Sequence, residues 1–216
     1  MTMIKTNESG RSMIEMLGVL AIIGVLSVGG IAGYSKAMNK FKTNKVADNV
    51  SMLVANIKTL YAQQNSYNGL DVNSAISMGV VPDELVSTRP DENGAGGALT
   101  NAYNGNVYIK AADSGTGADS AFYIIFTGLS KEACITLATN DWGSSFSSGL
   151  IGMQAKSGTG DNTAHTDADV DDIVMGCAGG SGIACAGKSM PMDVGDAATA
   201  CACDAGNTCS IFWKYY

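Results

Sequence analysis

Residues 16–34 read MLGVLAIIGVLSVGGIAGY, and this stretch decides the organisation of the chain. It contains no charged side chain; Glu15 lies directly before it and Lys36 shortly after it. As an α-helix these residues rise about 28 Å, which is close to the roughly 30 Å hydrocarbon core of a bilayer. The sequence therefore predicts a helix that can span a membrane, followed by a water-soluble head.

Three kinds of segment have this composition. A secretory signal peptide has a shorter apolar core, of about 7–15 residues, and then a cleavage site among small residues. A plain single-pass anchor fits the length but gives Glu15 no role, because an ionisable group beside a membrane segment is unfavourable without a partner. In the third kind the helix is processed and assembles with itself, so that Glu15 meets a positive charge supplied by another copy.

Residues 10–34, GRSMIEMLGVLAIIGVLSVGGIAGY, resemble the type IV prepilin signature. In that family a glycine precedes the cleavage site, a glutamate is the fifth residue after it, and an uncharged helix follows. The resemblance implies that residues 1–10 are a leader and that prepilin peptidase cuts after Gly10. Arg11 then becomes the N-terminus, which the family methylates, and Glu15 is the residue that acts in assembly.

Two positions depart from the family pattern. The first mature residue is usually large and apolar, whereas this chain has Arg11. The family also has a proline where this chain has Ala32. Gly29, Gly30 and Gly33 lie nearby and are expected to loosen the same turn, because glycine is a poor helix former.

The helix is expected to continue to about Tyr61. Apolar residues recur at steps of four, three, four and three along one face, namely Val46, Val50, Leu53, Ile57 and Leu60. This spacing is typical of an amphipathic helix. We therefore divide the helix into an apolar half, residues 11–35, and an amphipathic half, residues 36–64. The alternative is an anchor followed by a simple stalk.

The cysteines place the head in an oxidising compartment. All six lie in the last two fifths of the chain: Cys134, Cys177, Cys185, Cys201, Cys203 and Cys209. An even number of cysteines behind a membrane-targeting segment predicts disulfides. The lysines at positions 36, 40, 42 and 45 predict the opposite, a cytoplasmic head, because positive residues usually stay on the cytoplasmic side. The cysteines and the prepilin-like signature together outweigh them.

The head, residues 65–216, is expected to be an α+β domain. A short helix and a turn at Pro82-Asp83 should follow residues 65–69, and a helix carrying Cys134 on its inner side should begin near Ser130. Strands are expected at 106–112, 121–129, 149–155 and 209–216. Because strands outnumber head helices and no βαβ rhythm is present, the sequence predicts an antiparallel sheet packed on the long helix.

Three blocks extend the resemblance to the type IVb pilins, the thin-pilus and toxin-coregulated class. They are the segment GL…AISMGVVPDEL, AYNGNVYI and GLSKEACITL, so the likeness covers about the first 140 residues. It implies the pilin fold, in which a long N-terminal helix packs against an antiparallel sheet with a disulfide-bonded C-terminal region. It also implies that Cys134 is bridged to a cysteine near the C-terminus: Cys201, Cys203 or Cys209. Cys177 and Cys185 are expected to form a small local loop.

Several patterns look like chemical sites, but we interpret them as structural. Residues 182–189, GIACAGKS, match a phosphate loop, yet that loop requires a strand before it and a helix after it, and Pro191 leaves little room for the helix. The cysteine spacing does not suit structural zinc, and the single histidine, His165, is remote. The acidic residues Asp167, Asp169, Asp171 and Asp172 lack the glycine and final glutamate of an EF-hand. We predict no cofactor, no metal and no catalytic residues, and the net charge of −7 argues against a nucleic-acid partner.

The resemblance implies a structural protein rather than an enzyme: a subunit of a type IVb-like pilus that polymerises through its N-terminal helix. The implied partners are further copies in a helical homopolymer, prepilin peptidase, and the inner-membrane assembly platform and secretin. The head would be periplasmic while the helix is in the inner membrane, and extracellular in the pilus. The alternatives are a minor pilin, a type II secretion pseudopilin, or an unprocessed membrane-anchored binding domain.

Overall fold

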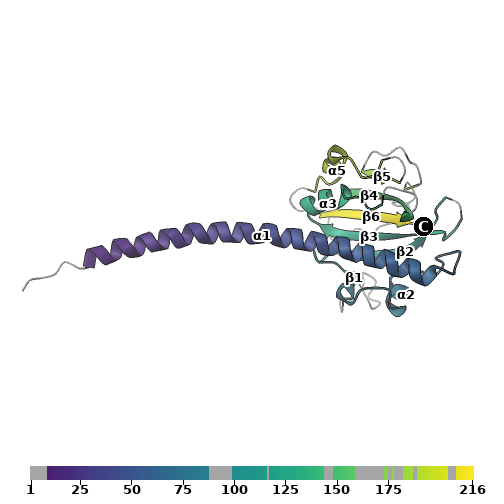
Figure 1. The fold of residues 1–216 in the computed structure, drawn as a ribbon, viewed down its shortest axis with the longest axis horizontal. Coiled ribbons are helices and arrows are strands. Elements are labelled where there is room, and N and C mark those ends of the chain that lie inside the picture. Colours follow the sequence, from purple (N-terminus) through teal and green to yellow (C-terminus); the bar gives the residue numbers. More distant parts are fainter. Residues whose placement is uncertain are drawn as a thin grey trace, which may run out of the picture. The chain divides into compact units, whose positions relative to one another are not determined.

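The computed structural model describes residues 9–87, 99–115, 117–143, 148–158, 173–174, 177, 182–186, 189–203 and 208–216, with the backbone alone for residues 9–12. The chain forms two compact units, Met1–Phe41 and Lys42–Tyr216. Helix α1 (Ser9–Tyr61) begins in the first unit and ends in the second (Figure 1). The predicted end of this helix at about Tyr61 is confirmed.

The described residues of the first unit form the N-terminal part of α1, up to Phe41. The helix runs unbroken through Gly29, Gly30 and Gly33, so the expected loosening does not interrupt it. A glycine costs a helix only about 1 kcal/mol relative to alanine, whereas a proline costs about 3 kcal/mol and removes a hydrogen bond.

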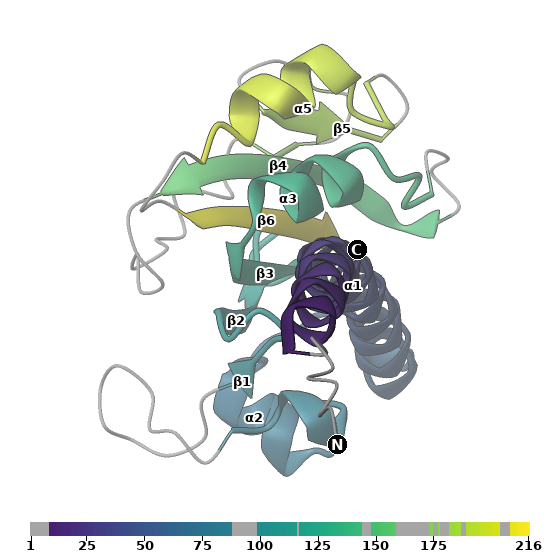
Figure 2. The same cartoon turned by 90° about the vertical axis from the view of Figure 1, so that its left-hand side faces the viewer.

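The second unit is built on an antiparallel sheet, as predicted. Its strands in the described residues are β1 (Leu99–Thr100), β2 (Asn106–Ala112), β3 (Ala121–Leu129), β4 (Leu150–Gly158), β5 (Ile183–Cys185) and β6 (Thr208–Tyr215). They lie in the order β1-β2-β3-β6-β4-β5, and every neighbouring pair is antiparallel. The last strand along the chain is therefore a central strand of the sheet (Figure 2).

Short helices begin at side chains that cap them. In α2 (Val72–Ser77), the Asp71 carboxylate accepts a hydrogen bond from the Ser74 N–H at 2.7 Å, and the Ser74 hydroxyl accepts one from the Asp71 N–H at 2.7 Å. This is a capping box, which satisfies two otherwise unpaired donors. The predicted turn at Pro82-Asp83 leads into one turn of 3₁₀-helix, η1 (Asp83–Leu85).

Two more helices stand near the disulfides. Helix α3 (Lys131–Ala138) begins at Ser130, whose hydroxyl accepts from the Ala133 N–H, and it contacts β6 and β4. Helix α5 (Val194–Ala200) begins at Asp193, whose carboxylate accepts from the Gly195 N–H at 2.8 Å. The sequence predicted α3 but not α5, because a seven-residue helix with three alanines and one large apolar residue has no apolar periodicity to detect.

The amphipathic half of α1 supplies one side of the main core. Val46, Val50, Leu53 and Ile57 are all fully buried, as the spacing predicted. The fifth member of the predicted stripe was wrong: Leu60 is 41% exposed, and Tyr61 is buried instead. The 3.6-residue repeat brings position 61 back under the stripe after Ile57, and the ring of Tyr61 lies 5.1 Å from that of Tyr67.

The two faces of the sheet carry separate apolar clusters. One face joins the α1 stripe to strand residues such as Phe122, Phe126 and Trp213, and to Leu137 of α3. The opposite face gathers a smaller cluster: Ala121, Tyr123, Ile125, Ile151, Ile173 and Phe212. Alternate residues of β3 and β6 thus serve opposite faces, as the period of a strand requires. The continuous apolar runs in these strands reflect burial on both sides.

A Leu53→Ala change should destabilise the head much more than Leu60→Ala, although both residues lie on the same helix. Leu53 is completely buried, so truncation removes packing and leaves a cavity, which typically costs about 2–5 kcal/mol. Leu60 is 41% exposed, and its loss should cost less than about 1 kcal/mol. Denaturant unfolding of the full chain in detergent, followed by tryptophan fluorescence, measures both. Equal losses would contradict the assigned register.

Candidate assembly interface

The apolar half of α1 exposes large hydrophobic side chains on every face. From Met13 to Tyr34 they are all at least 52% exposed: Met13, Ile14, Met16, Leu17, Val19, Leu20, Ile22, Ile23, Val25, Leu26, Val28, Ile31 and Tyr34. Among the described residues, α1 is the helix whose length and composition suit a membrane span. A continuous apolar surface of this extent marks a site that a membrane or other protein chains cover.

Glu15 is the one ionisable residue in this apolar surface. It is exposed, and its sequence neighbours Ile14 and Met16 are 73% and 61% exposed. When lipid or other helices cover this surface, the carboxylate loses water and requires a cationic partner. Gly10 and Arg11 lie in the first turns of the same helix, so the predicted cleavage site and Glu15 share one element.

The start of the amphipathic half is held by polar contacts to the head. The Thr43 hydroxyl and the Tyr103 hydroxyl are hydrogen-bonded at 2.8 Å, and the ammonium of Lys42 lies 5.5 Å from the centroid of the Tyr103 ring. Burial raises the pKa of Tyr103. Lys45 forms a 2.8 Å ion pair with Glu84, but both side chains are more than a third exposed, so the pair contributes at most about 1 kcal/mol.

The end of the amphipathic half is held by Lys58. Its ammonium donates a hydrogen bond to the Ser148 carbonyl at 3.0 Å and lies 5.1 Å from the centroid of the Tyr215 ring. Burial lowers the pKa of Lys58 and raises that of Tyr215. Lys58 is not one of the apolar residues of the predicted stripe, and the sequence gives no sign of this contact, because both partners are about 90 residues or more away.

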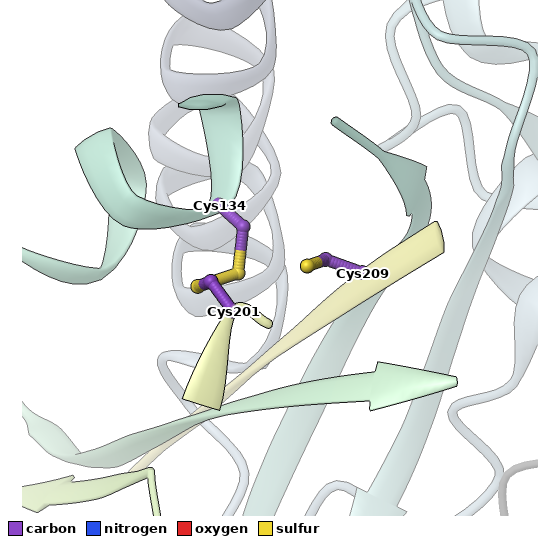
Figure 3. A group of neighbouring side chains, drawn as sticks. All are labelled: Cys134, Cys201 and Cys209. Atoms are coloured by element: carbon purple, nitrogen blue, oxygen red, sulfur yellow. A yellow bond between two sulfur atoms is a disulfide. The ribbon is translucent and has the colours of Figure 1, made fainter. Parts of the chain in front are cut away.

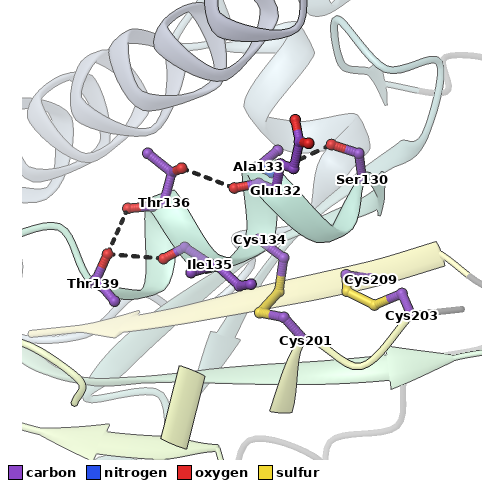
Figure 4. Close-up of a disulfide and its surroundings, with 10 residues drawn as sticks. All are labelled: Ser130, Glu132, Ala133, Cys134, Ile135, Thr136, Thr139, Cys201, Cys203 and Cys209. Carbon is purple, nitrogen blue, oxygen red and sulfur yellow. Dashed lines mark hydrogen bonds between the residues drawn. A yellow bond between two sulfur atoms is a disulfide. The ribbon is translucent and has the colours of Figure 1, made fainter. Parts of the chain in front are cut away.

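The structure pairs all six cysteines. Cys134 bonds to Cys201, one of the three partners that the resemblance left open. The expected local loop between Cys177 and Cys185 is present, and Cys203 bonds to Cys209. Figure 4 shows the Cys134–Cys201 and Cys203–Cys209 bridges side by side beneath α3. They tie α3 and the segment after α5 to the central strand β6.

Three of these sulfurs resemble a metal site in position but not in chemistry. The Sγ atoms of Cys134, Cys201 and Cys209 lie within 4.8 Å of one another, and all three residues are buried (Figure 3). A cysteine binds a metal as the thiolate, and each of these sulfurs is already bonded to another sulfur. The cluster is therefore a structural staple.

The remaining patterns do not converge on a site in the described residues. His165 and the acidic residues Asp167, Asp169, Asp171 and Asp172 lie outside them. In the phosphate-loop pattern, Ile183–Cys185 is strand β5, paired with β4, and Cys185 is disulfide-bonded. This part of the pattern is thus a strand in a sheet rather than a loop open to phosphate.

Comparison with known proteins agrees with the fold. The family model described as PilS N terminal matches residues 40–214. The major structural subunit of bundle-forming pilus from Escherichia coli O127:H6 is 30% identical over 141 residues, which cover 65% of this chain and 69% of that protein. Toxin coregulated pilin from Vibrio cholerae serotype O1 is 25% identical over 138 residues, covering 63% of this chain and 59% of that protein.

The similarity in sequence is accompanied by a similarity in fold to a solved structure. The crystal structure of TcpA, a type IV pilin from Vibrio cholerae El Tor biotype, has a TM-score of 0.54 at 16% identity and covers 81% of this chain and 99% of that one. A long apolar N-terminal helix, an antiparallel sheet and C-terminal disulfides together define the class of type IV pilins. The chain belongs to the PilS family within the type IVb pilins.

Proposed function

We propose that this chain is a prepilin that is cut after Gly10, held in the inner membrane by residues 11–35, and then polymerised into a type IVb pilus through α1. The observation that carries the proposal is the apolar, exposed surface between Met13 and Tyr34, which contains one carboxylate. The role as a structural subunit is supported by the relatives, which are named as a major structural subunit of bundle-forming pilus and as toxin coregulated pilin.

The apolar surface supplies cohesion in both environments. In the membrane it faces lipid, and in a fibre the same side chains face the helices of neighbouring copies. Burial of apolar area contributes about 25 cal/mol per Å², so thirteen large side chains give a bundle of such helices ample stabilisation. This term is not directional, however, and it does not decide how far one helix slides along the next.

Glu15 supplies the register. After cleavage, the free α-amino group of Arg11 would be the nearest cation on a neighbouring subunit, and a carboxylate among apolar helices is stabilised only when it meets such a group. A one-turn slip along the helix moves the two charges apart by about 5 Å and leaves both unpaired. The charge pair therefore fixes the stagger that apolar packing leaves free.

The other partners follow from this cycle. Prepilin peptidase would remove residues 1–10, an inner-membrane assembly platform would extract the helix, and a secretin would pass the fibre to the outside. The head would be periplasmic before assembly, where its three disulfides can form. We assign no enzymatic reaction to the chain, and the fibre's cohesion rests on the side chains described above.

The mature N-terminus tests the processing step. Intact-mass measurement of the full chain, expressed with a prepilin peptidase, should show a chain that begins at Arg11, with an added methyl group if the new amine is modified. A Gly10→Val change should leave residues 1–10 in place, whereas Gly18→Val, at another glycine of α1, should not affect cleavage. A purified native chain that still begins at Met1 would instead support an unprocessed membrane-anchored domain.

A further inference from the structure

Lys36 and Lys40 of α1 are not among the lysines whose contacts with the head are described above. Four lysines follow the apolar surface within eleven residues: Lys36, Lys40, Lys42 and Lys45. Lys42 and Lys45 contact the head, as described above. Lys36 and Lys40 belong to the first unit, and both are exposed. Because they are four residues apart, they lie on the same face of the helix.

Helix geometry places these two lysines at a defined depth. Counting 1.5 Å per residue from Met16, Tyr34 lies about 27 Å along the axis, Lys36 about 30 Å and Lys40 about 36 Å. The hydrocarbon core is about 30 Å thick, and each polar headgroup layer adds roughly 5–7 Å. If Met16 enters the core at one side, Lys36 and Lys40 therefore fall in the headgroup layer at the other.

The neighbouring aromatic residue fits the same depth. Tyr34 is 66% exposed, and on the same count from Met16 it falls at the boundary between the core and the headgroups. Tyrosine is enriched at this boundary because its ring is apolar and its hydroxyl is polar. The order along the helix is thus an apolar run, an interfacial aromatic residue and then two cations, which matches the profile of one bilayer leaflet.

We propose that Lys36 and Lys40 bind the phosphate groups of anionic phospholipids in the leaflet that faces the head. The inference rests on the proposed position of α1 in the inner membrane. Lipid binding also explains why lysines lie on the non-cytoplasmic side of the membrane, which usually carries few of them, because the lipid phosphates offset their charge. A lysine near an anionic surface contributes about 1 kcal/mol, which corresponds to about fivefold in association.

The competing occupant is an acidic surface on another copy of this chain, which has a net charge of −7. The depth argument favours lipid, because both lysines lie at the headgroup level for as long as the helix is in the membrane. Any membrane that contains anionic lipid offers phosphate charges that complement Lys36 and Lys40, whereas contact with another copy occurs only in a fibre. The experiment below distinguishes binding to lipid from binding to another copy.

The test uses the full chain reconstituted into phosphatidylcholine vesicles. Spin-labelled phosphatidylglycerol and spin-labelled phosphatidylcholine, added separately, report the lipid held at the protein surface. The wild-type chain should prefer phosphatidylglycerol about fivefold or more. A Lys36→Gln/Lys40→Gln chain should show nearly equal association of the two lipids. The wild-type preference should also weaken in 1 M salt, where the screening length falls to about 3 Å.

The matched control is Lys110→Gln/Lys156→Gln, which removes two exposed lysines from strands of the head. It should keep the wild-type lipid preference. A Lys36→Gln/Lys40→Gln chain that keeps the preference would overturn the proposal, and so would a wild-type chain without one. If the Lys36→Gln/Lys40→Gln chain keeps its lipid preference but forms no fibres, Lys36 and Lys40 instead contact another copy of this chain. A wild-type chain that holds neither lipid would instead refute the membrane position itself.

Discussion

A Glu15→Gln chain is expected to enter the membrane and to be cut after Gly10, but to form no fibres. Glutamine keeps the size of the side chain and removes the charge, so it tests the electrostatic role of Glu15 alone. At 4 Å and an effective dielectric constant near 20, such a pair attracts by about 4 kcal/mol before desolvation is subtracted. Repeated at every subunit, the loss removes the interaction that sets the stagger of the helices.

Electron microscopy of cells that carry a complete assembly system measures the fibres, and membrane fractionation and intact mass verify insertion and cleavage. Glu132→Gln is the matched control, because Glu132 is an exposed glutamate in the first turn of α3, on the head. It should leave fibres at the wild-type level. Fibres of normal number and length from Glu15→Gln would remove the role proposed for this carboxylate.

Arg11 allows the two cations at the mature N-terminus to be separated. An Arg11→Ala chain loses the guanidinium but keeps the α-amino group that cleavage creates. If Glu15 pairs with that amine, the cleaved variant should still assemble. A variant that is cut normally but gives no fibres would assign the partner of Glu15 to the guanidinium instead.

Removing the Cys134–Cys201 bridge should be the most destabilising change in the head. The bridge joins residues 67 apart in sequence, and the chain-entropy model gives about 4 kcal/mol for a loop of that length. Both cysteines are fully buried, so their replacement by serine also places a hydroxyl in the core. Since whole domains are stable by only about 5–15 kcal/mol, a Cys134→Ser/Cys201→Ser chain should be largely unfolded near 37 °C.

The matched control removes the Cys177–Cys185 bridge. Its residues are only 8 apart, and the same model gives about 2.5 kcal/mol. Thermal unfolding of the full chain in detergent, followed by near-ultraviolet circular dichroism, compares the two double-serine variants. A Cys177→Ser/Cys185→Ser chain that unfolds at a lower temperature than Cys134→Ser/Cys201→Ser would contradict the ranking.

The sequence predicted the elements whose signal is local. The bounds of β2 and β3 were predicted without error, because a turn rich in glycine and serine separates two apolar runs. The buried face of α1 was predicted from its repeat except at the last turn, where Tyr61 takes the place of Leu60. The short strands β1 and β5 were not predicted, since two or three residues carry no period.

The features of the fold that depend on contacts between residues far apart in the chain could not be predicted from the sequence. The resemblance to the type IVb pilins left three partners open for Cys134, and the fold selects Cys201 by bringing the end of α5 under α3. The polar contacts of α1 with Tyr103, Glu84 and Ser148 likewise depend on how the head folds back on the helix. Glu15, in contrast, is singled out by the sequence alone, because a carboxylate at the edge of an uncharged run stands out without any tertiary information; its role in assembly stays a prediction.

The position of β6 between β3 and β4 has a consequence for biogenesis. The residues of β6, Thr208–Tyr215, are synthesised long after β3. The edges of β3 and β4 that pair with β6 therefore stay unpaired until this last segment is made. Pairing between segments so far apart is slow, because a long loop has to close first. The apolar half of α1, by contrast, precedes the whole head in the chain, so under the proposed function each subunit would be tethered to the membrane before its head can finish folding.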